Sequence, residues 1–180
     1  MSRADPPAVG TGKPAPWYAR YVATMEGRDV QRVLRGQGTR LRAACAGLSD
    51  ADALHRYAPE KWSVKEVIGH IGDTERVMAY RALRFGRGDS TMLPGFDQNA
   101  YVREAGFDAR PLGDLLDEFD VVRAATVALF ASFTPEQLDR WGVANGTEMS
   151  VRILSGIIPG HAEHHLGILR DRYGLGVPAM

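Results

Sequence analysis

The amino-acid sequence predicts an all-α protein, a four-helix bundle with a long crossover between its second and third helices. Four segments carry apolar residues at the three- and four-residue spacing of an amphipathic helix. Strand-like alternation is scarce, and the chain has no internal repeat. Helices with one apolar face are stable when they bury those faces against each other, so four of them favour a bundle. The long connection at residues 86–106 indicates that the helices do not simply alternate up and down.

Capping residues give the expected limits of these helices. Ser63 and Glu66 form a capping box, in which a hydroxyl and a carboxylate satisfy free amides at a helix start. Pro111 suits the first turn of the third helix, and Gly174 suits the stop of the last one. The expected helices are residues 29–48, 63–85, 111–132 and 150–173. A short capped helix is expected at residues 134–138, and an irregular or extended stretch at residues 141–148.

Length and composition favour a single domain. A chain of 180 residues can bury a proper core without disulfide staples. Residues 1–16 are rich in proline, glycine and alanine and are expected to form a flexible N-terminal leader, which leaves residues 17–180 as the domain. Cys45 is the only cysteine, so no intramolecular disulfide forms, and the reducing cytoplasm is the expected compartment. We expect Cys45 to be a small buried residue.

Charge and hydropathy argue against two classes of partner. Lysine plus arginine and aspartate plus glutamate number 22 each, so the formal net charge is zero, and no dense basic run is present. Nucleic acid, whose phosphates attract basic surfaces, is therefore not an expected partner. No segment approaches the roughly 20 apolar residues that span a bilayer, and the N-terminal stretch lacks the apolar run of a signal peptide. No membrane association is expected.

Three of the five histidines lie in the run His161-Ala162-Glu163-His164-His165. Residues four apart share one face of a helix, so the imidazoles of His161 and His165 converge. Burying an unpaired polar group costs more than a typical hydrogen bond returns, so a transition metal or a hydrogen-bond network must satisfy these rings. Their position in the core is indicated by the aliphatic residues on the same face, which are Leu154, Ile158 and Ile168.

A third core-facing imidazole is available. His70 lies at the edge of the apolar arc of the second helix. If the second and last helices are neighbours, His70, His161 and His165 form the three-imidazole set that holds catalytic zinc with one position open. Imidazole suits nickel equally, so the expected metal is zinc or nickel. The open position takes water or a thiolate beside a small-molecule substrate, which leaves hydrolysis and thiol transfer both open.

The other polar residues of these helices have different expected roles. A histidine pair four apart also occurs as a surface or hydrogen-bonded pair, but its place on the apolar stripe favours a metal. Glu163 does not directly follow the first histidine of the run, as the glutamate of a zinc-protease HExxH motif does, so a protease is rejected. Glu163 is expected to face solvent. His164 lies about 100° round the helix from His165, so it is expected either behind the metal ligands or at the surface. Glu75 is a candidate hydrogen-bond partner of a histidine.

Three motifs follow one another along the chain. They are Lys61-Trp62-Ser63 leading to His70 and Glu75, then Leu93-Pro94-Gly95-Phe96-Asp97, and then Met149-Ser150-Val151 followed by His161-x-x-x-His165. In this combination and order, residues 28–173 resemble the DinB/YfiT-like family of metalloenzymes.

The resemblance implies a fold, a metal site and a class of reaction. Members of the family are four-helix bundles with a long crossover, often homodimers, and hold a divalent metal with positions that match His70, His161 and His165. Characterised members include thiol transferases that use bacillithiol or mycothiol and a mycothiol-dependent isomerase, so a low-molecular-weight thiol is an expected cofactor. The family name derives from a DNA-damage-inducible gene and does not imply polymerase activity.

The sequence leaves three functions open. The first is a metal-dependent thiol S-transferase. The second is a helical bundle that binds a metal or a small ligand and catalyses nothing. The third is a hydrolase in which the metal activates water, for which the sequence shows no convincing general base. No residue pattern identifies a catalytic group, the thiol or the substrate, so the reaction rests on the resemblance.

Overall fold

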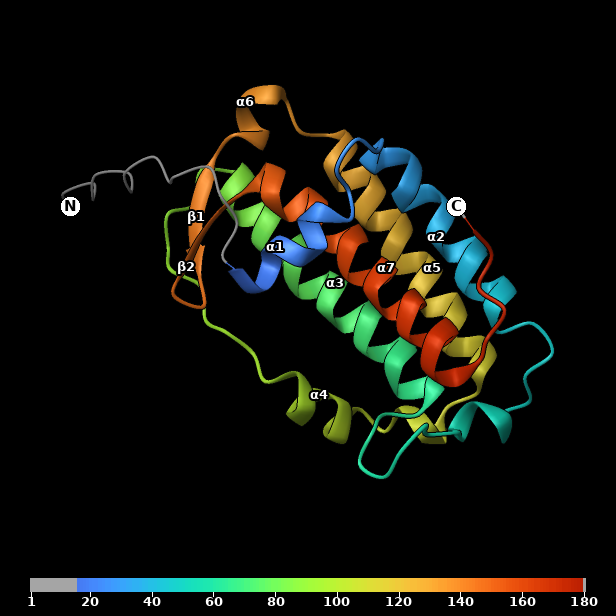
Figure 1. Cartoon of the computed structure of the whole chain (residues 1–180). Coiled ribbons are helices and arrows are strands. Elements are labelled where there is room, and N and C mark those ends of the chain that lie inside the picture. Colours follow the sequence, from blue (N-terminus) through green and yellow to red (C-terminus); the bar gives the residue numbers. More distant parts are fainter. Residues whose placement is uncertain (1–15, 180) are drawn as a thin grey trace.

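A computed structural model describes residues 16–179, and its architecture is a four-helix bundle (Figure 1). Helix α3 packs against α5 and α7, and α2 packs against the same two helices, so α2 and α3 lie at opposite corners. Helices α3 and α5 run in the same direction, and the crossover between them returns along the outside of the bundle (Figure 1). The predicted bundle with a long crossover is confirmed. Its long helices are α2 (Val30–Ala44), α3 (Val64–Gly86), α5 (Leu112–Ala131) and α7 (Val151–Tyr173).

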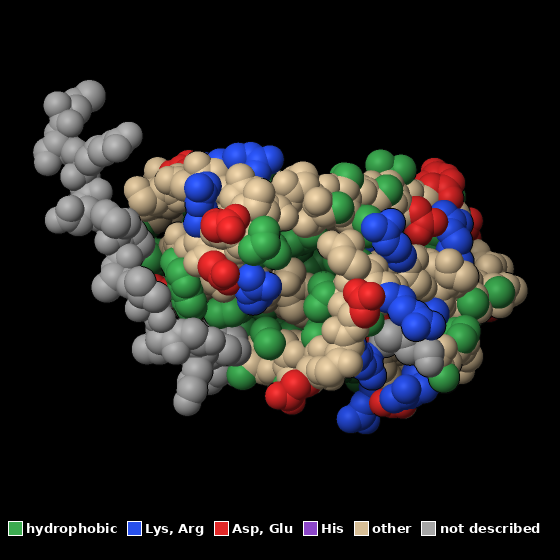
Figure 2. Space-filling view, turned by 90° about the horizontal axis from the view of Figure 1, so that it is seen from above, with side chains coloured by type: hydrophobic (Ala, Val, Ile, Leu, Met, Phe, Trp, Pro, Cys, Tyr) green, Lys and Arg blue, Asp and Glu red, His purple; other side chains and the backbone are tan. Residues whose placement is uncertain are grey.

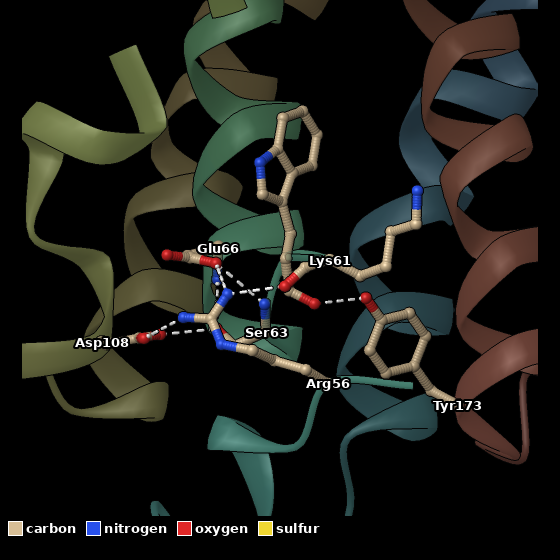
Figure 3. A network of polar contacts seen from close by, with 7 residues as sticks. Arg56, Lys61, Ser63, Glu66, Asp108 and Tyr173 are labelled. Carbon is tan, nitrogen blue, oxygen red and sulfur yellow. Dashed lines mark hydrogen bonds and ion pairs between the residues drawn. The ribbon is translucent and has the colours of Figure 1, made fainter. Parts of the chain in front are cut away.

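Capping signals set the start of α3 and the end of α7 as predicted, whereas α2 ends at Ala44, four residues before its expected limit. At the start of α3, Glu66 N–H donates to the Ser63 hydroxyl over 3.0 Å, and Ser63 N–H donates to the Glu66 carboxylate over 2.9 Å. Figure 3 shows that Arg56 and Asp108 bind this same pair, which ties the start of α3 to two connecting segments. These segments contain the 3₁₀ turns η1 (Asp52–Leu54) and η2 (Phe107–Ala109). At the same end of the bundle, Gly174 stops α7 in the left-handed conformation, at φ 69°.

The crossover is anchored on a small β-hairpin. Strands β1 (Trp141–Ala144) and β2 (Thr147–Ser150) pair antiparallel where an irregular or extended stretch was expected. Their turn is Asn145-Gly146, and both residues have positive φ, as the tightest hairpin turns require. Leu93 of the crossover donates to the Val143 carbonyl and accepts from Asn145 N–H, at 2.9 and 3.0 Å. Further along, the crossover holds the two-turn helix α4 (Gln98–Ala105).

Two short helices complete the fold. Helix α6 (Pro135–Leu138) carries the expected capping box of Thr134 and Gln137. Helix α1 (Pro16–Ala23) was not predicted, and it begins at the last residue assigned to the leader. Residues 1–15 lie outside the described part of the chain. Helix α1 crosses α7 at Gly160, where any larger side chain would collide with the carbonyl of Tyr21.

A polar layer divides the core into two hydrophobic clusters. One cluster centres on Ile68, Leu115 and Leu166, and the other on Met78, Phe130 and Leu154. Between them lie buried polar residues from all four long helices, which are Gln37, His70, Glu75, Arg123, His161 and His165. Since polar groups are retained in a core only when partners satisfy them, this layer is where a site is expected.

The surface mixes charges and apolar groups. On the face seen in Figure 2, basic and acidic side chains lie interspersed with hydrophobic ones, and hydrophobic side chains line a hollow near the middle. Among residues 16–179, no helix combines the length and the apolar character that crossing a membrane requires.

Candidate metal centre

Three histidines meet in the polar layer at the middle of the bundle. His70 comes from α3, and His161 and His165 come from successive turns of α7. One nitrogen of each ring lies within 4.8 Å of a nitrogen of each of the others, and the Nε2 atoms of His70 and His161 are 3.0 Å apart. Their exposed fractions are 3, 6 and 8 %. The structure therefore brings together the three residues that the sequence singled out.

The donor set fits a single transition-metal ion. Zinc binds imidazole nitrogen at about 2.0–2.1 Å, so two ligands of one ion lie roughly 3 Å apart. The separation of the His70 and His161 nitrogens has this value. The Nδ1 of His165 is buried and has no hydrogen-bond partner among the described residues, although a buried polar atom normally has one. An ion bound at Nδ1 would supply the missing partner.

All three rings are held in the neutral form that ligates metals. Burial, followed by the charge of His164, lowers the pKa of His70 to about 4. Burial holds the pKa of His161 well below its ordinary value, and the neighbouring His165 adds to the effect. The pKa of His165 is likewise held well below its ordinary value, first by burial and then by His70. At neutral pH no proton therefore competes strongly for these nitrogens.

Close packing on both sides fixes the imidazoles. The ring of Trp62 lies 4.5 Å from that of His70, and the hydroxyl of Tyr173, which Figure 3 labels, donates to the Trp62 carbonyl at 2.5 Å. On the opposite helix, the close approach of α1 at Gly160 brings the ring of Tyr21 to 5.4 Å from His161. Aromatic walls of this kind exclude water and limit rotation of the rings.

Comparison with known proteins identifies the family. The sequence model of the DinB superfamily matches residues 34–169. The chain belongs to the DinB superfamily. A protein of Geobacillus kaustophilus named "putative metal-dependent hydrolase" is 26% identical over 147 residues, which cover 78% of this chain and 82% of that protein. A protein of Oceanobacillus iheyensis with the same description is 28% identical over 134 residues, which cover 73% of this chain and 76% of that protein.

The fold of this DinB protein also matches a solved structure. YfiT from Bacillus subtilis, described as "a probable metal-dependent hydrolase with an unusual four-helix bundle topology", superposes with a TM-score of 0.69 at 18% sequence identity. The match covers 81% of this chain and 86% of YfiT. The bundle topology is therefore shared, and a buried three-histidine cluster supports binding of a divalent metal.

Other polar residues of the DinB chain differ from the sequence-based expectation. Glu75 does not contact a histidine but forms a buried ion pair with Arg123, at 2.7 Å. Glu163 does not face solvent, because the Gln37 amide donates to it at 2.7 Å and Arg40 pairs with it. Both differences arise from arginine or glutamine on neighbouring helices, which the periodicity of one helix cannot reveal.

Two predicted side roles agree with the structure. His164 is not part of the cluster, and its ring lies edge-on at 5.5 Å from Tyr21 and 5.1 Å from His165. Cys45 is buried in the core, and burial raises the pKa of its thiol to about 11, so it stays protonated at neutral pH.

Two cavities border the histidine cluster of this DinB protein. His161 lines a cavity of about 240 Å³ together with Thr74, Arg81 and Asn145. His165 lines a second cavity of about 260 Å³ together with Glu60, Trp62 and Tyr173. Small molecules therefore have access to the cluster from two sides, through different histidines.

Proposed function

We propose that this protein is a metal-dependent enzyme that transfers a low-molecular-weight thiol to a small organic substrate. His70, His161 and His165 would hold one divalent transition ion, with zinc or nickel as the candidates because imidazole suits both.

The homodimer that the family resemblance implies belongs to the same proposal, and light scattering of the purified protein would test it.

The observation that carries the proposal is the pair of cavities. A transferase needs room for two organic molecules beside one reactive centre, whereas hydrolysis needs room for one and for water. The cavities differ in charge, since two arginines, Arg20 and Arg81, line the one at His161, whereas Glu60 and Lys61 line the one at His165. Different linings favour two different ligands.

The chemistry favours a thiol over water as the nucleophile. A divalent ion in partly dry surroundings lowers the pKa of a thiol or a water molecule that contacts it. A free thiol has a pKa of about 8.5 and water one of about 15.7, so the thiol needs a much smaller shift. In the transfer, the thiol sulfur bonds to an electrophilic carbon, the bond from that carbon to its leaving group breaks, and the thiol proton passes to solvent.

The chain's own residues would exclude water and orient the reactants. Trp62 and Tyr21 wall the cluster from two sides, and burial keeps all three imidazoles neutral. Cys45 is not the nucleophile, because it lies in the core and its pKa is raised to about 11.

A hydrolase is the second candidate, and Glu60 is the observation that favours it. Glu60 lines the cavity at His165 and has a φ of 63°, in a turn closed by a hydrogen bond from Lys61 N–H to the Ala58 carbonyl. Glycine is the usual residue at such a position, so a glutamate there indicates a role for its side chain. A carboxylate at this place could accept a proton from water. The relatives named as metal-dependent hydrolases support this candidate.

Two measurements test the proposal. Elemental analysis of untagged protein should find a stoichiometric divalent ion, and His165→Ala should lose it, whereas His55→Ala, which changes an exposed histidine away from the cluster, should not. Conjugation of thiols to a panel of electrophiles should then require both metal and His165. Activity without any thiol that is lost in Glu60→Gln would establish the hydrolase instead, and metal uptake without either activity would leave a binding protein.

A further inference from the structure

The cavity at His161 is rich in hydrogen-bond donors. Its lining includes the side chains of Tyr18, Arg20, Thr74, Arg81, Gln98 and Asn145. Within the described part of the chain, neither aspartate nor glutamate lines this cavity. The imidazole of His161 adds no negative charge, because it is neutral. A cavity with cationic and neutral donors and no carboxylate has a positive potential, which favours an anionic occupant.

Arg81 is the unusual residue of this cavity. Its side chain is 2 % exposed, yet it forms no ion pair with any residue of the described range 16–179. Its one oxygen acceptor there is the Pro94 carbonyl at 2.9 Å, and its other contact is the sulfur of Met78 at 3.5 Å. A guanidinium carries five N–H donors and is always charged, so most of its hydrogen-bonding capacity is unused. Buried charges of this kind are normally paired.

The position of Arg81 suits a ligand that also reaches the histidines. Thr74, Met78 and Arg81 follow His70 along one face of α3, at steps of four, four and three residues. Side chains on a helix lean toward its N-terminus, so Arg81 leans toward the end of α3 that carries His70. The same cavity is bordered by Arg81 and by His161. A small molecule anchored at the guanidinium therefore extends toward the cluster.

The chemistry of the cavity favours a carboxylate over a phosphate. The planar fork of arginine binds a carboxylate with two parallel hydrogen bonds. A phosphate dianion usually gains further bonds from backbone amides at a helix start. Here the first amides of α4, on Asn99 and Ala100, already donate to the carboxylate of Asp97, at 2.9 and 3.1 Å. Asp97 stands between the two cavity-lining residues Phe96 and Gln98, where its charge repels a dianion more strongly than a carboxylate, which carries one charge.

We propose that the substrate that enters the cavity at His161 is a small carboxylic acid, and that Arg81 anchors its carboxylate. This assignment rests on the proposed function, since it names the class of substrate used at the same site. The cavity volume of about 240 Å³ is below the roughly 300–1,000 Å³ of typical ligand pockets, so the acid is a small one.

Binding of simple probes to the metal-free protein tests this proposal. Without metal, a carboxylate has no ion to coordinate, so binding reports on the cavity alone. We expect NMR titration to show saturable binding of propionate and at least tenfold weaker binding of propionamide, which has the same shape but no charge. Arg81→Met should weaken propionate binding at least tenfold, and Arg81→Lys, which keeps the charge but not the fork, should fall between. Arg84→Met, on the next turn of α3 and outside the cavity, should bind as the wild type does.

The melting temperature of each variant shows whether it is folded. Arg81→Met should melt at or above the temperature of the wild type, because an unpaired buried charge is removed. If Arg81 had only a structural role, the same substitution would lower the melting temperature. If Arg81→Met does not fold, the comparison of propionate with propionamide on the wild type still tests whether the cavity prefers a carboxylate. Equal binding of the two probes, unchanged binding in Arg81→Met, or tighter binding of inorganic phosphate than of propionate would each overturn the proposal. Propionate binding in a protein that takes up no metal would overturn only the proposed function.

Discussion

The buried ion pair between α3 and α5 gives the sharpest prediction about stability. Arg123 donates to the Glu75 carboxylate over 2.9, 3.1 and 2.7 Å, and also to the Leu34 carbonyl and to Gln37. The side chains of Glu75 and Arg123 are 2 and 5 % exposed. Arg123→Met leaves the carboxylate of Glu75 buried without its counter-ion. Removing one partner of such a pair costs about 3–5 kcal/mol, a large part of the roughly 5–15 kcal/mol that holds a domain together.

The double variant separates the charge from the packing. Replacing both partners, as in Glu75→Leu with Arg123→Met, should leave the free energy of unfolding within about 1 kcal/mol of the wild type, because no uncompensated charge remains. Arg76→Met is the matched control, since Arg76 is exposed and pairs with Glu118 on the surface, where a pair is worth about 0–1 kcal/mol.

Urea unfolding followed by circular dichroism measures all three variants. The reasoning is refuted if Arg123→Met costs no more than Arg76→Met, or if the double variant is as unstable as Arg123→Met alone. In either case the buried pair would not control stability.

Three further predictions concern the metal centre and its surroundings. Zinc at a hundred times its dissociation constant should stabilise the protein by about 2.7 kcal/mol, which raises Tm by roughly 5–11 °C, and His165→Ala should abolish the shift in calorimetry. The metal-free protein should lose stability in urea titrations as the pH falls from about 6.5 to 4. The pKa of His70 is about 4 in the folded protein and about 6.5 in the unfolded chain, so the unfolded chain binds more protons in that window. His70 accounts for at most about 3 kcal/mol of the loss in the free energy of unfolding. Glu60→Gly should raise the free energy of unfolding by roughly 0.5–1 kcal/mol, because glycine tolerates the left-handed φ of 63°.

Each of these predictions has a contrary outcome. A Tm that zinc does not move, in protein that elemental analysis shows to be loaded, would mean that the ion binds the unfolded chain as well. A stability that is flat between pH 6.5 and 4 would mean that His70 titrates equally in both states. A loss of stability in Glu60→Gly would show that the glutamate side chain makes a contact that outweighs the strain of its backbone.

The histidine cluster was predictable because it depends on local sequence patterns. The four-residue spacing of His161 and His165 places both rings on one face of α7, and the apolar residues of that face direct them inward. Ser63 and Glu66 give the start of α3, which sets the direction in which His70 points. Periodicity and caps of this kind act within a few residues, so the sequence displays them directly.

The polar partners of the site were not predictable in the same way. Gln37 donates to the Pro159 carbonyl and to Glu163, more than a hundred positions away in the chain. Nothing in the spacing of α2 distinguishes Gln37 from a solvated glutamine, because its burial depends on how α7 packs. Helix α1 was missed for a related reason, since the signal for its docking is Gly160, a small residue on α7 whose partner lies elsewhere.

Two buried arginines show how this fold separates structure from function. Arg123 has its guanidinium satisfied by a carboxylate, a carbonyl and an amide oxygen, so it serves the structure of the core. Arg81 is equally buried, but its guanidinium donates hydrogen bonds only to one carbonyl and one sulfur of the described residues. Among residues 16–179, Arg81 and the imidazole of His165 are incompletely satisfied and line cavities at the histidine cluster, whereas a third such group, the Oε1 of Gln31, lies in a different cavity beside α1. A fold retains unsatisfied buried groups at a cost in stability, so the two that lie beside the histidines support the cluster as the candidate site.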